Sequence, residues 1–153
     1  DPINMSDAVG EYIEVYNPGP VAQEIGGWRL ESDDGDVAVL PSPLPIDVGQ
    51  RLLLARSDDI SQGGGLVPDA VYDGMSLSNT ADQVRLVHPS GLIIDAVGYD
   101  ASWPLVAGRS LELLDGSLDH LSNDTVDAWC TSSSAPYALG NMGTPGESTG
   151  PCD

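Results

Sequence analysis

The chain has 153 residues, enough for one domain with its own hydrophobic core and too few to require a second. Its 18 Gly and 12 Pro residues disfavour long helices, and no apolar run approaches the ~18 residues of a membrane span, so we expect no membrane insertion. The net charge of −19 repels nucleic-acid backbones and anionic lipids, so we expect no nucleic-acid partner, while divalent cations and basic partners remain compatible.

The first part of the chain predicts three short strands. Residues 10–17 (GEYIEVYN) are rich in β-branched and aromatic side chains, and residues 25–32 (IGGWRLES) alternate apolar with charged positions. The acidic turn at residues 33–36 contains Asp-Gly, which supplies the positive φ of a tight hairpin, and residues 37–40 form the returning strand.

Prolines interrupt the pattern after that hairpin. We expect no sheet ladder over residues 41–45, because they contain three prolines. The next strand is expected over residues 50–55 (QRLLLA). Residues 57–82 are predicted to be irregular, and the glycine run at 63–65 is interpreted as a flexible surface loop.

The second half predicts a hairpin of residues 83–87 and 92–99, followed by strands over 109–114 and 127–130. Seven or eight short strands separated by turns indicate an all-β antiparallel sandwich or barrel, forming one domain over residues 1–153. The tail from Thr144 to Asp153 is predicted to be linker-like.

The hydrophobic core is predicted from the apolar side chains of these strands. Burial of a Trp or Leu is worth ~2 kcal/mol or more, which explains their presence without a ligand. The predicted core residues are Trp28, Leu30, Leu52, Leu54, Val84, Leu86, Ile94, Val97, Leu111, Leu113 and Trp129. Arg109 is predicted to form a structural ion pair with Asp95 or Glu112.

Nine local phrases in this order resemble the lamin tail domain family. They are GEYIEVYN (10–17), GWRL (27–30), VGQRLLLA (48–55), LSN with DQVRL (77–79 and 82–86), PSGLIIDAVGY (89–99), WP (103–104), GRSLEL (108–113), WC (129–130) and GTPG (143–146). Each phrase alone is weak, but together they cover nearly the whole chain. Ala81 departs from the family pattern, which has Gly before the aspartate.

The resemblance implies an immunoglobulin-like antiparallel β-sandwich. Animal members form the tails of nuclear lamins, where they act as interaction platforms, and bacterial members are accessory modules of secreted nucleases, phosphoesterases and surface proteins. The family also has an opening strand about a dozen residues before its GE phrase. Since Ile3 lies too close to Glu11 for that strand, we expect the first strand upstream of Asp1.

Cys130 and Cys152 are predicted to form a disulfide, because two cysteines in a secreted protein usually pair. Two buried free thiols are the alternative. Closing the loop stabilises the fold by about 3 kcal/mol through the entropy of the unfolded chain, and pins the C-terminal segment to the last strand.

Calcium is the one cofactor that the sequence brings into consideration, because Ca²⁺ binds several oxygen ligands on flexible backbone. Two acidic clusters are the candidates. They are Asp33, Asp34 and Asp36, and Asp58 and Asp59 with Asp69 and Asp73. A solvated acidic turn is the simpler interpretation of both, so the principal prediction is that the chain has no cofactor.

No catalytic residue is predicted. His88 precedes a proline in a hairpin turn, and His120 lies close to Asp119 and Ser122, but triad members meet in space rather than in sequence, and no Gly-x-Ser-x-Gly elbow occurs.

The principal functional hypothesis is a non-catalytic interaction or structural module of a larger exported bacterial protein, extracellular or at the cell surface. Its partner is a protein or a surface polymer, met through loops or an exposed strand edge. We expect a monomer, with edge-strand association as the alternative. The other functional hypotheses are a calcium-dependent or carbohydrate-binding adhesion module, and an accessory part of a secreted hydrolase whose catalytic domain lies outside this chain.

Overall fold

The computed structural model describes residues 1–62 and 65–153 and consists mainly of short strands. Gly63 and Gly64, part of the glycine run interpreted as a flexible loop, lie outside the described residues. The first nine strands are β1 (Tyr12–Tyr16), β2 (Gln23–Glu24), β3 (Arg29–Glu31), β4 (Val37–Val39), β5 (Pro45–Ile46), β6 (Arg51–Ala55), β7 (Ala70–Val71), β8 (Asp82–Val87) and β9 (Ile93–Tyr99). The last four are β10 (Leu111–Leu113), β11 (Trp129–Thr131), β12 (Pro136–Ala138) and β13 (Asn141–Met142).

Helical structure is limited to single turns. They are the α-helical turn α1 (Asp7–Gly10) and the 3₁₀ turns η1 (Asp115–Ser117), η2 (Ser122–Asp124) and η3 (Val126–Ala128). Within the described ranges, none of these is long or apolar enough to cross a bilayer.

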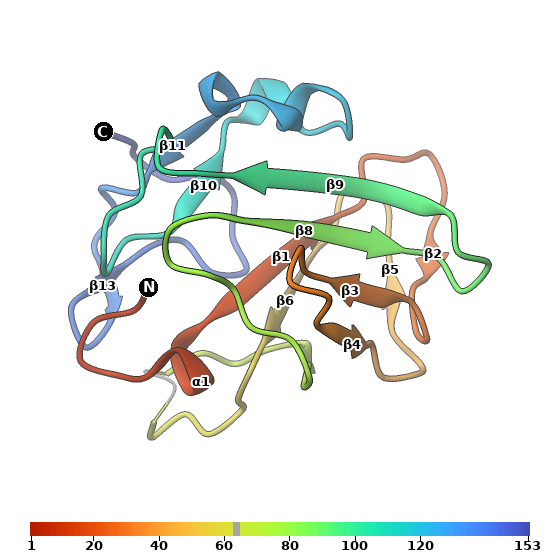
Figure 1. Cartoon of the computed structure of the whole chain (residues 1–153), viewed down its shortest axis with the longest axis horizontal. Coiled ribbons are helices and arrows are strands. Elements are labelled where there is room, and N and C mark those ends of the chain that lie inside the picture. The colour runs from red at the N-terminus through yellow and green to blue at the C-terminus, as the bar shows by residue number, and fades with distance from the viewer. Residues whose placement is uncertain (63–64) are drawn as a thin grey trace.

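The strands form two facing layers. One layer is the antiparallel sheet β4-β3-β8-β9, and the other contains β1-β6-β7, with the small sheets β2-β5, β10-β11 and β12-β13 beside them. Figure 1 shows β8 and β9 running across the molecule, with β1 and β6 crossing behind them. The predicted all-β sandwich is confirmed, with the β6–β7 pair as its parallel exception.

The main core lies between these layers and is built by alternation along the strands. Leu30 of β3 and Leu54 of β6 are 1% and 0% exposed, and Ile13 and Val15 of β1 pack against the same cluster. Arg29 and Glu31, which flank Leu30, point away from the core and form an ion pair at 2.8 Å. The period-two pattern therefore predicted correctly which face of β3 is buried.

Eight of the eleven predicted core residues are only half-buried. Leu30, Leu52 and Leu54 are fully buried, and Trp28, Val84 and Leu86 pack against them. The remaining side chains line an open cavity instead of meeting a partner layer; they are Ile94, Val97, Leu111, Leu113 and Trp129.

Several strands differ from the sequence prediction. The strand predicted over residues 25–32 is reduced to β3, because Gly27 adopts a φ of +79° and Trp28 N–H donates to the Ile25 carbonyl in a turn. Pro45 begins strand β5, contrary to the expectation that residues 41–45 carry no ladder, since proline is tolerated as the first residue of a strand. The predicted irregular stretch 57–82 contains β7, and β12 and β13 were also missed.

Candidate functional site

A cavity of about 590 Å³ opens between the two layers. Strands β8 and β9 contribute mainly alternate residues to it, such as Val84 and Leu86, as strands do when one face borders a space. In contrast, every residue of the segments 10–16 and 105–113 lines it. Consecutive lining residues mean that β1 and β10 border the cavity with their edges. The cavity is therefore a groove between two strand edges, with an apolar floor.

Strand β1 uses only one edge for pairing in the part of the chain that the structure describes. Arg56 N–H donates to the Glu11 carbonyl at 3.2 Å, and Asn17 N–H donates to the Gln50 carbonyl at 3.0 Å. In an antiparallel pair these bonding residues alternate with residues whose backbone groups point to the other edge. The N–H and C=O groups of Tyr12, Glu14 and Tyr16 therefore point away from β6.

Strand β10 is arranged in the same way. Ser132 N–H donates to the Ser110 carbonyl at 3.0 Å, and Leu114 N–H donates to the Ala128 carbonyl at 2.9 Å. By the same alternation, the backbone groups of Leu111 and Leu113 point away from β11. The Leu113 carbonyl accepts a hydrogen bond from the Thr149 hydroxyl, which leaves the backbone groups of Leu111 as the open part of this edge.

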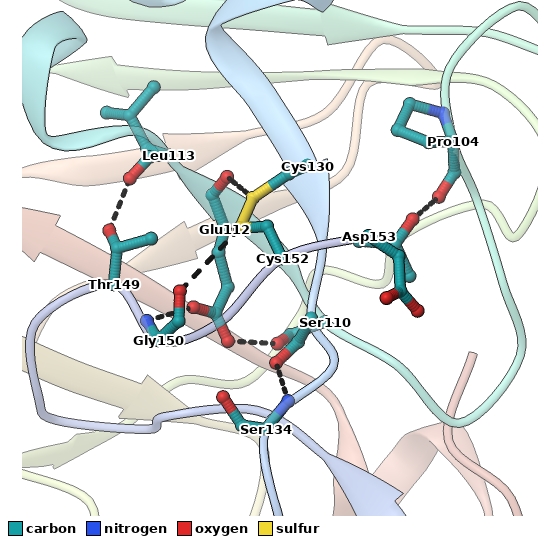
Figure 2. The surroundings of a disulfide bond; sticks show 12 residues. Pro104, Ser110, Glu112, Leu113, Cys130, Ser134, Thr149, Gly150, Cys152 and Asp153 are labelled. Atoms are coloured by element: carbon teal, nitrogen blue, oxygen red, sulfur yellow. Dashed lines mark hydrogen bonds between the residues drawn. A yellow bond between two sulfur atoms is a disulfide. The ribbon is translucent and has the colours of Figure 1, made fainter.

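The C-terminal tail is hydrogen-bonded to side chains of both β1 and β10 and is not a free linker. Gly146 N–H donates to Glu14 at 2.7 Å, and Gly150 N–H donates to Glu112 at 2.7 Å. The disulfide between Cys130 and Cys152 anchors the tail to β11, as the sequence predicted. Figure 2 shows the disulfide, Glu112 and the Thr149–Leu113 contact gathered at this wall of the groove.

Arg109 pairs differently from the prediction. Its guanidinium forms an ion pair with Asp153 rather than with Asp95 or Glu112. Glu112 accepts its hydrogen bonds from Gly150 N–H and Ser110 Oγ instead, and Asp95 accepts one from Asn123 Nδ2 at 2.9 Å. The sequence prediction failed because it could not place the side-chain carboxylate of Asp153 beside Arg109.

The walls of the groove are acidic. Their carboxylates outnumber the guanidinium groups of Arg51 and Arg109, and belong to Asp1, Glu11, Glu14, Asp95, Glu112, Asp119 and Glu147. Burial raises the pKa of the Glu14 carboxyl to about 7; the Gly146 N–H and Arg51 lower this pKa, and Glu112 raises it further. The Glu14 side chain is nevertheless exposed to solvent and remains accessible from the groove.

Two buried carboxylates of the groove are engaged by the fold. Glu11 accepts hydrogen bonds from Tyr72 Oη at 3.0 Å and from Leu77 N–H at 3.1 Å. Burial raises the pKa of Glu11, and these hydrogen bonds and Arg56 lower it again. Glu112 is 6% exposed and connects β10 to the tail. Glu11 was not singled out from the sequence, and Glu112 was named only as a partner for Arg109. The position of Glu112 between Leu111 and Leu113 on β10 was a usable signal.

The predicted calcium candidates lie outside this groove. Asp33 forms an ion pair with Arg85 at 3.6 Å, Asp36 accepts a hydrogen bond from Ser76 Oγ at 3.3 Å, and Asp59 accepts hydrogen bonds from Ser61 and Gln62 in its own turn. Among the described residues, no group of three or more His, Cys, Asp or Glu side chains is placed to hold a metal ion. Calcium binding by Asp33, Asp34, Asp36, Asp58 and Asp59 stays a prediction.

The two histidines occupy different places. His88 Nδ1 lies 2.8 Å from Ser90 Oγ, and its ring packs edge-on against Trp28 with centroids 5.3 Å apart. His120 lines the groove. The carboxylate of the neighbouring Asp119 accepts a hydrogen bond from the Ser122 hydroxyl. Over residues 1–62 and 65–153, no hydrogen bond joins either imidazole to a carboxylate.

A family model described as Lamin Tail Domain matches residues 2–101 of the chain. The match covers β1 to β9 and the floor of the groove, and ends before β10, β11 and the disulfide. No curated protein and no solved structure matches the chain.

Proposed function

The chain belongs to the lamin tail domain family, and on that premise we propose that it is a non-catalytic interaction module of a larger secreted or cell-surface bacterial protein. The family consists of immunoglobulin-like, non-catalytic domains. The proposal is that this domain has no catalytic role in the whole protein either, and that it serves there to bind a partner.

The observation that carries the proposal is the groove between β1 and β10. It joins an apolar floor to two strand edges with open backbone groups, and such edges bind other polypeptides by main-chain hydrogen bonding. Exposed apolar grooves rimmed by polar groups are typical of interaction sites. The extracellular location is supported by the Cys130–Cys152 disulfide, since disulfides persist in oxidising compartments.

Position-specific photo-crosslinking tests the interaction. A photo-reactive amino acid is placed at Leu111, on the wall of the groove, in the intact secreted protein. The matched control carries it at Val39, which is 62% exposed on the distant strand β4. We expect a discrete crosslinked product from position 111 only. Equal products from both positions, or none from 111, contradict the proposal.

The non-catalytic part is tested with a panel of esters, phosphodiesters and glycosides. We expect the purified chain to hydrolyse none of them faster than a heat-inactivated sample. Turnover that disappears in a His120→Ala variant contradicts the proposal, because His120 is the imidazole that lines the groove.

A carbohydrate-binding module is the second candidate, and the aromatic lining of the groove favours it. Tyr12, Tyr99, Trp103 and Trp129 all border the groove, and aromatic rings combine apolar faces with polar groups for recognising a ligand. Titration with oligosaccharides, followed by the fluorescence of Trp103 and Trp129, separates this candidate from the first.

A further inference from the structure

We propose that Asp73 is a site of spontaneous covalent modification, at which the Asp73–Gly74 linkage cyclises to a succinimide and reopens as isoaspartate. The reaction needs no enzyme or cofactor, and the inference does not depend on the proposed function.

The sequence contains three Asp-Gly pairs, and their local structures differ. They are Asp34-Gly35, Asp73-Gly74 and Asp115-Gly116. Gly74 N–H donates to Asp73 Oδ1 at 2.8 Å, so the Asp73 carboxyl is folded back over the amide nitrogen that follows it. Gly35 N–H donates to the Ser32 carbonyl at 3.3 Å instead. Asp115 begins the turn η1, and within the described residues no hydrogen bond joins its carboxylate to Gly116. Of these three pairs, only the one at 73–74 holds the carboxyl against the nitrogen that has to attack it.

The fold requires glycine at position 74. Gly74 has a φ of +87°, and an added Cβ would lie only 2.8 Å from the Val37 carbonyl oxygen of β4. Glycine has no side chain to shield its amide nitrogen, and both Asp73 and Gly74 are exposed to solvent. The close approach to β4 therefore places an unhindered amide directly after an aspartate.

Two further aspartates make the same contact and serve as internal references. The N–H groups of Gln83 and Ala96 donate to Asp82 and Asp95 at 2.7 and 2.8 Å. Both aspartates lie inside the paired strands β8 and β9, and the residue after each carries a side chain. The strand pairing and the side chain oppose the backbone rotation that ring closure needs, so the hydrogen bond alone is not expected to give reaction there.

The reaction balances without a co-reactant. The Gly74 nitrogen attacks Cγ of the protonated Asp73 carboxyl, the N–Cγ bond forms, and the carboxyl O–H leaves with the amide proton as water. Water then opens the cyclic imide at either carbonyl. Opening at Cγ restores aspartate, whereas opening at the former main-chain carbonyl leaves the chain connected through Cγ as isoaspartate. Holding the nitrogen and the carboxyl in contact lowers the entropic cost of this ring closure.

The modified linkage lies between two anchors in the core. Tyr72 and Met75 are each 1% exposed. The segment also holds the buried Glu11, which accepts hydrogen bonds from Tyr72 Oη at 3.0 Å and from Leu77 N–H at 3.1 Å. Isoaspartate lengthens the main chain between the anchors by one carbon atom. Because the interior is close-packed, the extra atom displaces an anchor and weakens the hydrogen bonds to Glu11.

The test is incubation of the native chain in H₂¹⁸O at mildly acidic pH, where more of the carboxyl is protonated, followed by peptide mapping by mass spectrometry. Each opening of the imide introduces one ¹⁸O atom, and fragmentation distinguishes isoaspartate from aspartate. We expect labelling at Asp73 to be about fivefold or more faster than at Asp34 and Asp115, with Asp82 and Asp95 at background. The same incubation in denaturant is the matched control. The three Asp-Gly pairs share one local chemistry there, so their rates should agree within about twofold.

An exposed substitution tests the effect on stability. Asp73→Glu keeps the charge but blocks the reaction, because the longer side chain would have to close a larger, less favoured ring. After incubation, the wild type is expected to contain a second population that melts several degrees lower, in proportion to its isoaspartate content. Asp73→Glu is expected to lack this population, and the matched control Asp34→Glu to age like the wild type.

Three results overturn the inference. Labelling at Asp73 that is no faster than at Asp34 and Asp115 in the native chain rejects the site. An advantage of Asp73 that persists in denaturant also rejects it, because the local sequence rather than the fold would then be the cause. Isoaspartate at Asp73 with no loss of stability rejects the predicted effect on Glu11.

Discussion

Glu14 and Glu112 stand on the two facing walls of the groove, and the same tail segment binds both. Gly146 N–H donates to Glu14 and Gly150 N–H donates to Glu112, each at 2.7 Å. In the described structure no strand pairs with both β1 and β10, so the tail is what connects them. The tail also holds the two carboxylates at the edge of the groove.

The raised pKa of Glu14 predicts a pH-dependent stability. Its pKa rises from 4.5 in the unfolded chain to about 7 in the folded one, because burial disfavours the charge. Below pH 4.5 the carboxyl is neutral in both states and has no effect; between pH 4.5 and 7 it is ionised mainly in the unfolded state. The contribution of Glu14 to stability therefore falls as the pH rises through this window.

The measurement is the NMR titration of the Glu14 side-chain carboxyl, assigned with Glu14→Gln. We expect a midpoint near 7 and a decline in melting temperature from pH 4.5 to 7 that is smaller in Glu14→Gln. A midpoint near 4.5 would contradict the raised pKa of this group.

Removing the disulfide is expected to destabilise the fold by about 3 kcal/mol, because Cys130 and Cys152 are separated by 22 residues and the crosslink restricts the unfolded chain. For a chain of this length that corresponds to a fall in melting temperature of roughly 6–12 °C. The variant is Cys130→Ser with Cys152→Ser. A reductant should lower the melting temperature of the wild type to the same extent and have no effect on the double variant.

Tyr72→Phe is expected to destabilise the protein by about 1–2 kcal/mol, because it takes a donor away from the buried Glu11 carboxylate. Tyr72 is 1% exposed, so water cannot replace the hydroxyl without rearrangement. The matched control is Tyr137→Phe, whose ring packs against Tyr12 and is only half-buried. Urea unfolding of both variants gives the difference; equal losses would mean that the hydrogen bond from Tyr72 to Glu11 contributes nothing of its own.

Calcium is expected to leave the melting temperature unchanged relative to Mg²⁺ at equal ionic strength. The Asp33 carboxylate pairs with Arg85, Asp36 accepts a hydrogen bond from Ser76 Oγ, and Asp59 accepts hydrogen bonds within its own turn. Asp34 and Asp58 are exposed. A rise of several degrees specific to Ca²⁺ would contradict this expectation, since a ligand that binds only the native state stabilises it. The triple variant Asp33→Asn, Asp34→Asn and Asp36→Asn would then tell which cluster binds.

The apolar pattern was sufficient to predict the long strands. The β8–β9 hairpin lies where alternation placed it. Strand β6 was predicted from a continuous apolar run and is buried on both faces, because Leu52 and Leu54 lie in the main core, whereas Leu53 and Ala55 lie in a second cluster. The two-residue strand β7 gave no such signal. It is held by long-range contacts, in which Asp69 N–H donates to the Leu53 carbonyl and Leu53 N–H donates to the Asp69 carboxylate, both at 2.8 Å.

The groove itself could not be predicted from the sequence. Leu111 and Leu113 have the spacing of core residues, and nothing local distinguishes a side chain that meets another layer from one that borders a cavity. Glu14 and Glu112 interrupt apolar strands, which is a usable signal for a functional position. Their proximity, however, depends on how β1 and β10 are placed by the whole fold.

Amide hydrogen exchange of strand β1 in the free protein tests the central claim most directly. If the edge of β1 that borders the groove is open, the amides of Tyr12, Glu14 and Tyr16 exchange rapidly, while those of Ile13 and Val15, bonded to β6, exchange slowly. The matched reference is the outer edge of β4, where Val37 and Val39 are expected to exchange as rapidly as Tyr12. Uniformly slow exchange across all five β1 residues would mean that this edge is already paired, and would contradict the account.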